Sequence, residues 1–109
     1  MTEWTRVKAI ALCIAVEAIA PTYGAHVALT GGLLYKEGPR KDADLLFYCI
    51  RQVDNIDEEG LLEALELIGL KTYWQHGWVR KAVWMGLEVD LFFPEAYPAR
   101  GAPSANGTY

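Results

Sequence analysis

The sequence predicts a small α+β domain, with a small mixed β-sheet and helices packed on one face of it. Apolar residues recur at helical spacing near the N-terminus and again over residues 58–68. Short apolar runs of strand length lie between and after these two segments. The chain has 109 residues, which suffices for one domain that buries one hydrophobic core.

The first predicted element is a helix from about Glu3 to Ala20, which Thr2 can cap and Pro21 ends. Part of this segment resembles the apolar core of a signal peptide, but Glu17 interrupts it. We therefore expect a helix of the folded domain rather than a secretion signal. Its predicted core-facing stripe consists of Val7, Ile10, Ala11, Ile14 and Ala18.

Two strands are predicted in the middle of the chain. A short buried strand from His26 to Leu29 runs into the pair Gly31-Gly32. Residues 33–35 are compatible with a brief helical turn, and residues 36–41 form a polar loop. The second strand, from Asp42 to Ile50, is apolar for most of its length, which predicts a central place in the sheet.

The last predicted elements are a second helix and three further strands. Asp54 or Asp57 can cap the helix from Glu58 to Ile68, and Gly69 ends it. The strands cover about Lys71–Gln75, Trp78–Trp84 and Leu87–Phe93, with a tight turn at Met85-Gly86. The composition then becomes rich in Pro, Gly, Ala and Ser, so we expect one domain over residues 1–94 and a flexible tail over 95–109.

Charge and composition argue against several classes of protein. The net charge is −4 and the isoelectric point about 5.1, so extended nucleic-acid binding is not expected. No apolar stretch is long enough to span a bilayer, so no membrane association is expected. Cys13 and Cys49 lie within apolar runs and lack the spacing of a zinc site, which favours a reducing, cytoplasmic environment.

Three aspartates indicate a site. Asp42 and Asp44 are two positions apart at the start of a strand, so their side chains would point to the same side. Asp90 interrupts an apolar strand, where an unpaired charge is costly to bury, and a cation shared with the other two would compensate it. Three carboxylates form a hard oxygen site that suits Mg²⁺ or Mn²⁺. Upstream, Gly31-Gly32 allows the backbone to approach a ligand closely.

These residues together resemble the signature of the DNA polymerase beta-like nucleotidyltransferase superfamily, in a minimal form. The matching order is Gly31-Gly32, a spacer ending in Arg40-Lys41, and then Asp42-Ala43-Asp44 before an apolar strand. Asp90 resembles the third acidic residue of that family, which lies on a later strand. The resemblance covers about residues 23–94 and implies transfer of a nucleoside monophosphate from a nucleoside triphosphate to an acceptor.

The resemblance also implies a role for each matching residue. Asp42, Asp44 and Asp90 would bind Mg²⁺ or Mn²⁺, and Asp90 would also orient or deprotonate the acceptor hydroxyl. The backbone N–H groups of Gly31 and Gly32 would hold the triphosphate. Arg40 and Lys41 could add positive charge near the phosphates.

Other interpretations remain open. Larger relatives carry a further domain that holds the acceptor, so we expect a protein partner or a second copy to complete the site. A catalytically inactive binding or regulatory module with the same fold is an alternative, and a structural subunit that assembles through its aromatic residues is another. For His26 we expect a packed or hydrogen-bonded side chain. His76 would lie in a turn, where its aromatic neighbours could also stack on a base. The remaining aromatic residues expected in the core or an interface are Trp4, Trp84, Phe92 and Phe93.

Overall fold

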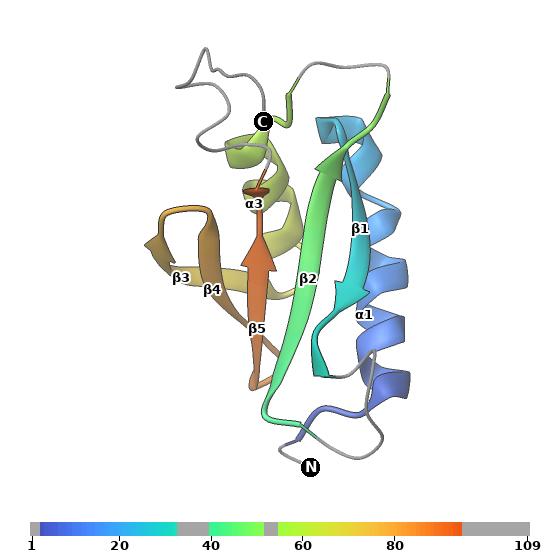
Figure 1. Cartoon of the computed structure of the whole chain (residues 1–109), viewed down its shortest axis with the longest axis vertical. Helices are drawn as coiled ribbons and strands as arrows, with labels where there is room; N and C mark the ends of the chain where they lie inside the picture. The colour runs from blue at the N-terminus through green and yellow to red at the C-terminus, as the bar shows by residue number, and fades with distance from the viewer. Residues whose placement is uncertain (1–2, 33–39, 52–54, 95–109) are drawn as a thin grey trace.

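The computed structural model describes residues 3–32, 40–51 and 55–94 (Figure 1). Its elements are α1 (Arg6–Glu17), a short 3₁₀ helix (Ala20–Tyr23), β1 (Ala25–Thr30), β2 (Asp42–Cys49), α3 (Glu58–Glu66), β3 (Leu70–His76), β4 (Val79–Trp84) and β5 (Leu87–Phe92). The turn expected at residues 33–35, residues 36–39 of the expected loop, the tail at 95–109 and the expected caps Thr2 and Asp54 lie outside the described residues.

The five strands form one mixed sheet in the order β1-β2-β5-β4-β3. Only the central pair, β2 and β5, is parallel, and the other neighbours are antiparallel. The chain leaves β2, passes through α3 and the β3–β4 hairpin, and returns to place β5 beside β2. This crossover brings Asp90 next to Asp44, because the two residues are paired in the β2–β5 register.

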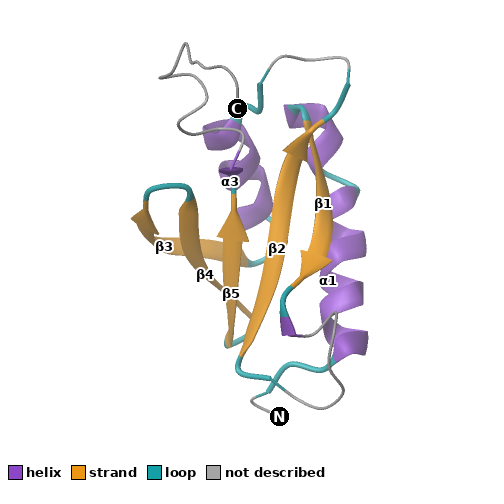
Figure 2. Ribbon diagram, viewed as in Figure 1, coloured by secondary structure: helices purple, strands orange, loops and turns teal. Residues whose placement is uncertain are grey.

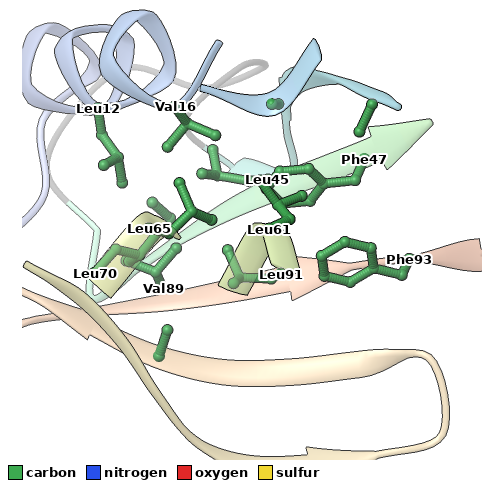
Figure 3. Close-up of a cluster of buried hydrophobic side chains, with 14 of the residues drawn as sticks. Leu12, Val16, Leu45, Phe47, Leu61, Leu65, Leu70, Val89, Leu91 and Phe93 are labelled. Carbon is green, nitrogen blue, oxygen red and sulfur yellow. The ribbon is translucent and has the colours of Figure 1, made fainter. Parts of the chain in front are cut away.

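Both long helices cover the same face of the sheet, as predicted (Figure 2). Figure 3 shows side chains from α1 and α3 meeting those of the central strands in one cluster. Full burial of each such aliphatic side chain contributes about 1.5–3 kcal/mol. The buried members labelled there on α1, α3, β2 and β5 are Leu12, Val16, Leu61, Leu65, Leu45, Phe47, Val89 and Leu91.

Side chains that alternate with this core point to the opposite side of the sheet, which no described helix covers. We call this side the open face. Its members on β2, β5 and β4 are Asp42, Asp44, Leu46, Tyr48, Glu88, Asp90, Phe92, Val79, Lys81 and Val83. All three predicted site aspartates therefore lie on one face.

The predicted core stripe of the first helix is wrong. The structure buries Ala9, Leu12 and Val16, whereas Val7 and Ile14 are 78% and 67% exposed. Ile10 is also exposed, and Ala11 and Ala18 are outside the buried set. Because the segment is apolar almost all round, its spacing could not show which stripe would meet the sheet. Its bounds also differ, since the helix begins at Arg6 with Thr5 as its cap and ends at Glu17.

Tertiary contacts explain why the helix starts late. Trp4 pairs with Arg40 through two backbone hydrogen bonds of 2.7 and 2.9 Å. Its ring is fully buried, stacks on Trp84, and donates a hydrogen bond from Nε1 to the carbonyl of Glu88. The segment before α1 is thereby fastened to the start of β2, next to the candidate site.

The other predicted elements are largely confirmed. Asp57 caps α3 by accepting a hydrogen bond from the Gly60 N–H, although this helix ends at Glu66. His26 is hydrogen-bonded, as expected, with Nδ1 against the carboxylate of Glu17. Among residues 3–32, 40–51 and 55–94, no helix is long and apolar enough to cross a membrane.

Candidate functional site

One row of paired residues crosses the whole sheet on the open face. In strand order it consists of Thr30, Asp44, Asp90, Lys81 and Trp74, each opposite the next in register. We call it the central row. Neighbouring strands lie roughly 4.8 Å apart, so the row places groups from all five strands on one line.

Asp42 belongs to the adjacent row on the same face. It precedes Asp44 by two positions and is paired with Glu88 of β5. Burial raises the pKa of Asp44, and the carboxylates of Asp90 and Asp42 raise it further, while Lys81 lowers it. Asp44 is therefore close enough to Asp42 and Asp90 to be repelled by both. A cation bound among them would relieve that repulsion.

A lysine that was not anticipated from the sequence partly meets this need. Lys81 Nζ lies 3.1 Å from Asp90 Oδ1, and the side chain of Asp90 is only 15% exposed. Asp90 Oδ1 nevertheless has no hydrogen bond of regular geometry among the described residues. The contact with Asp90 raises the pKa of Lys81, because the carboxylate favours the charged ammonium.

Counting along the last hairpin would have found this lysine. Met85 and Gly86 form a two-residue turn with φ values of 53° and 78°, as a type I′ turn requires. From that turn, Trp84 pairs with Leu87, and three steps further Lys81 pairs with Asp90.

The glycine pair lies directly beside the carboxylates. Gly31 has φ +74°, and a Cβ added there would be 2.0 Å from Asp44 Oδ2. Its backbone can therefore approach Asp44 only because glycine has no side chain. A Cβ on Gly32 would be 3.1 Å from Nε of Arg40, which is buried and has no hydrogen-bond partner among the described residues. The Gly31-Gly32 backbone, which no side chain of its own covers and which we call the cradle, lies beside an unpartnered guanidinium N–H, and this combination suits a phosphate.

Of the predicted phosphate-binding residues, Arg40 is thus placed beside the cradle. Lys41 is exposed immediately before β2, and the structure shows no role for its side chain. In the described part of the chain, no group of three or more His, Cys, Asp or Glu side chains is arranged to hold a metal ion. Carboxylates of this type suit Mg²⁺ or Mn²⁺, and full coordination would require Asp90 to turn away from Lys81.

Aromatic residues from the β3–β4 hairpin stand at the far end of the central row. The register of β3 shifts between Thr72 and Trp74, and the extra residue, Tyr73, donates a hydrogen bond of 2.6 Å from its hydroxyl to Glu88 Oε1. The rings of Trp74 and His76 are parallel within 9°, with centroids 5.6 Å apart. His76 is the last residue of β3 and does not lie in the turn, so the simplest expectation for it is wrong.

Comparison with known proteins supports the fold assignment. No family model matches the chain, and no curated protein matches its sequence. The structure is similar to a solved one described as a cytoplasmic RNA terminal U-transferase, with a TM-score of 0.56 and 19% sequence identity. The match covers 82% of this chain and 27% of the other. At this identity the likeness concerns the fold, and the chain has the nucleotidyltransferase-like α+β fold that the sequence predicts.

Proposed function

We propose that this domain is a metal-dependent nucleotidyltransferase, which moves a nucleoside monophosphate from a nucleoside triphosphate to an acceptor. One observation supports this most strongly. The Gly31 backbone lies against the Asp44 carboxylate, on the same face as Asp42 and Asp90. The similar fold of a terminal U-transferase is consistent with this chemistry.

The residues present fit the metal by type and by electrostatics. Asp42, Asp44 and Asp90 would hold Mg²⁺ or Mn²⁺ through hard carboxylate oxygens, and such an ion would relieve the repulsion of Asp44 by the other two. When bound, the metal would neutralise charge on the phosphates and on the departing pyrophosphate. The protein's own part is to hold the reactants and to handle a proton.

The triphosphate would bind at the β1 end of the central row. The backbone N–H groups of Gly31 and Gly32 and the unpartnered Nε of Arg40 would donate to its oxygens, and Lys41 could add charge. Asp90 would orient the acceptor hydroxyl and accept its proton. The acceptor oxygen forms a bond to the α-phosphorus, and the bond from that phosphorus to the bridging oxygen breaks. Its electron pair leaves with pyrophosphate.

Nucleotidyl transfer is tested with purified protein, Mg²⁺ or Mn²⁺, and each of the four triphosphates labelled at the α-phosphate. Label should pass to an acceptor, or pyrophosphate should be released, and both Asp42→Asn and Asp90→Asn should abolish this. The control is Tyr48→Phe, which alters a half-exposed side chain elsewhere on β2. Activity that survives in either aspartate variant would sink the assignment.

A catalytically inactive binding or regulatory module is the second candidate, and Lys81 favours it. The ammonium group already compensates Asp90, as a structural substitute for a metal would. In that case a triphosphate with metal should raise the melting temperature, while no labelled product forms.

We also propose how the acceptor side of the site is completed and in which compartment the protein works. The chain spans 27% of the length of the terminal U-transferase it resembles. We expect a protein partner or a second copy of this chain to complete the acceptor side of the site. We also retain the expectation of a reducing, cytoplasmic environment, which rests on the placement of Cys13 and Cys49 in apolar runs without the spacing of a zinc site.

A further inference from the structure

We propose that Trp74 and His76 form a stacking surface for the nucleobase of the acceptor, so that the acceptor is a nucleotide or a nucleic-acid end. This inference rests on the proposed nucleotidyl transfer. It names the class of acceptor and two residues that would bind it, neither of which follows from the carboxylates and the glycines. Both rings are on β3, at the opposite end of the central row from the glycine pair.

The direction of the reaction places the acceptor on this side. In phosphoryl transfer, the attacking and leaving oxygens lie roughly in line on opposite sides of the phosphorus. The phosphate cradle of Gly31 and Gly32 follows β1, so pyrophosphate would leave toward that edge of the sheet. The attacking hydroxyl must then enter from the β4–β3 side. The next groups met along the central row there are Lys81 and Trp74.

A β-bulge turns the tryptophan toward the site. Before the bulge, Thr72 is opposite Ala82, which points into the core. If Tyr73 were paired like its neighbours, strict alternation would put Trp74 on the same side as Thr72, the helix side. The hydrogen bond from Tyr73 to Glu88 fixes the extra residue, so Trp74 emerges opposite Lys81 on the open face.

The rings are available for stacking. Trp74 is 51% exposed, and His76 is exposed beside it with its ring nearly parallel. A separation of 5.6 Å between their centroids leaves no room for a base between them, so a base would stack on an outer ring face. Aromatic rings can stack on any of the bases in this way, whatever the sequence of the strand.

Spacing and charge favour a nucleotide over a tyrosine side chain as acceptor. Trp74 is two strands from Asp90 in the sheet order, or roughly 10 Å at the usual strand spacing. A nucleotide separates its hydroxyl from its base by a sugar, whereas the hydroxyl of tyrosine is attached to the ring itself. Lys81 stands between the two positions, where it can contact an acceptor phosphate. With a net charge of −4, the protein would hold a terminal nucleotide rather than a long track.

The experiment measures binding without turnover. A short fluorescein-labelled single strand with a free 3′ hydroxyl, made as RNA and as DNA, is titrated with full-length protein in EDTA, and its anisotropy is recorded. Trp74→Ala should weaken binding by about fivefold to about a hundredfold, the value of one stacked base. Trp74→Phe should retain most of the affinity. The control Tyr48→Ala removes an exposed aromatic ring further along β2, four residues beyond Asp44, and should leave the affinity unchanged.

Several results would overturn the inference. One is that the wild type binds neither strand. Another is that Trp74→Ala and the wild type bind equally well. A third is that a tyrosyl peptide displaces the labelled oligonucleotide. A melting curve for each variant excludes unfolding as the cause of weaker binding. The two proposals also fail separately. Transfer that needs Asp42 but uses an acceptor without a base would refute the stacking surface alone.

Discussion

The close approach of Gly31 to Asp44 makes a quantitative prediction about Gly31→Ala. The new alanine would have to keep the φ of +74° that Gly31 has, in the left-handed region, which costs about 1–2 kcal/mol for a residue with a side chain. It would also lie 2.0 Å from Asp44 Oδ2, so the carboxylate must rotate. Leaving a preferred rotamer costs about 0.5–1.5 kcal/mol. The two costs together lower the free energy of unfolding by about 1.5–3.5 kcal/mol.

Gly86→Ala is the matched control for this substitution. Gly86 has φ +78°, but a Cβ there would meet nothing within 4 Å, so only the backbone cost of about 1–2 kcal/mol applies. The difference between the two variants isolates the contact with Asp44. It should shrink when both substitutions are made in an Asp44→Ala background, which removes the clashing carboxylate.

Urea denaturation in EDTA, followed by tryptophan fluorescence, measures these differences. Each kcal/mol corresponds to a fall in melting temperature of roughly 4–8 °C for a domain of this size, so thermal melts provide a second reading. Equal losses in Gly31→Ala and Gly86→Ala would refute the close approach of Gly31 to Asp44. The same conclusion would follow if the Asp44→Ala background left their difference unchanged.

Three further outcomes follow from the described contacts. Folding raises the pKa of Asp44, so the charged carboxylate costs stability as pH rises from the ordinary pKa of 3.8 through the folded value. Asp44→Asn should therefore stabilise the metal-free protein at pH 7. In urea melts below pH 3.8 the variant and the wild type should differ little. Lys81→Met leaves Asp90 uncompensated and should destabilise the metal-free protein by about 1 kcal/mol, whereas Lys81→Arg should not, and equal urea midpoints for the two would contradict the ion pair. Trp4→Phe removes the hydrogen bond from the buried Trp4 ring to the carbonyl of Glu88 and should cost about 1 kcal/mol or more in the same assay, so an unchanged midpoint would count against that hydrogen bond.

Local sequence patterns predicted most of the helices and strands, because the ends of these elements depend on the chemistry of a few neighbouring residues. Asp57 caps α3 and the Met85-Gly86 turn joins β4 to β5, and both features are visible in a few residues of sequence. The failure at α1 has a physical cause. Its surface is apolar nearly all round, so only the position of the sheet decides that Leu12 is buried and Ile14 is not.

The placement of the three aspartates on one face could be predicted from the sequence, but the residues around them could be predicted only in part. Asp42 and Asp44 share a face because they are two apart, but their meeting with Asp90 depends on a crossover that only the family resemblance implied. Lys81 could have been found by counting from the turn. The bulge at Tyr73 could not have been predicted, because no local pattern shows that one residue of β3 is unpaired. The side that Trp74 occupies was therefore visible only in the structure.

The most direct test of the central claim is a crystal structure of the protein with Mn²⁺ and a non-hydrolysable nucleoside triphosphate. The account predicts anomalous density for Mn²⁺ among the carboxylates of Asp42, Asp44 and Asp90, with Lys81 displaced from Asp90. It also predicts phosphate oxygens within hydrogen-bond distance of the Gly31 backbone. Mn²⁺ or triphosphate bound elsewhere, with the contact between Lys81 and Asp90 intact, would contradict it.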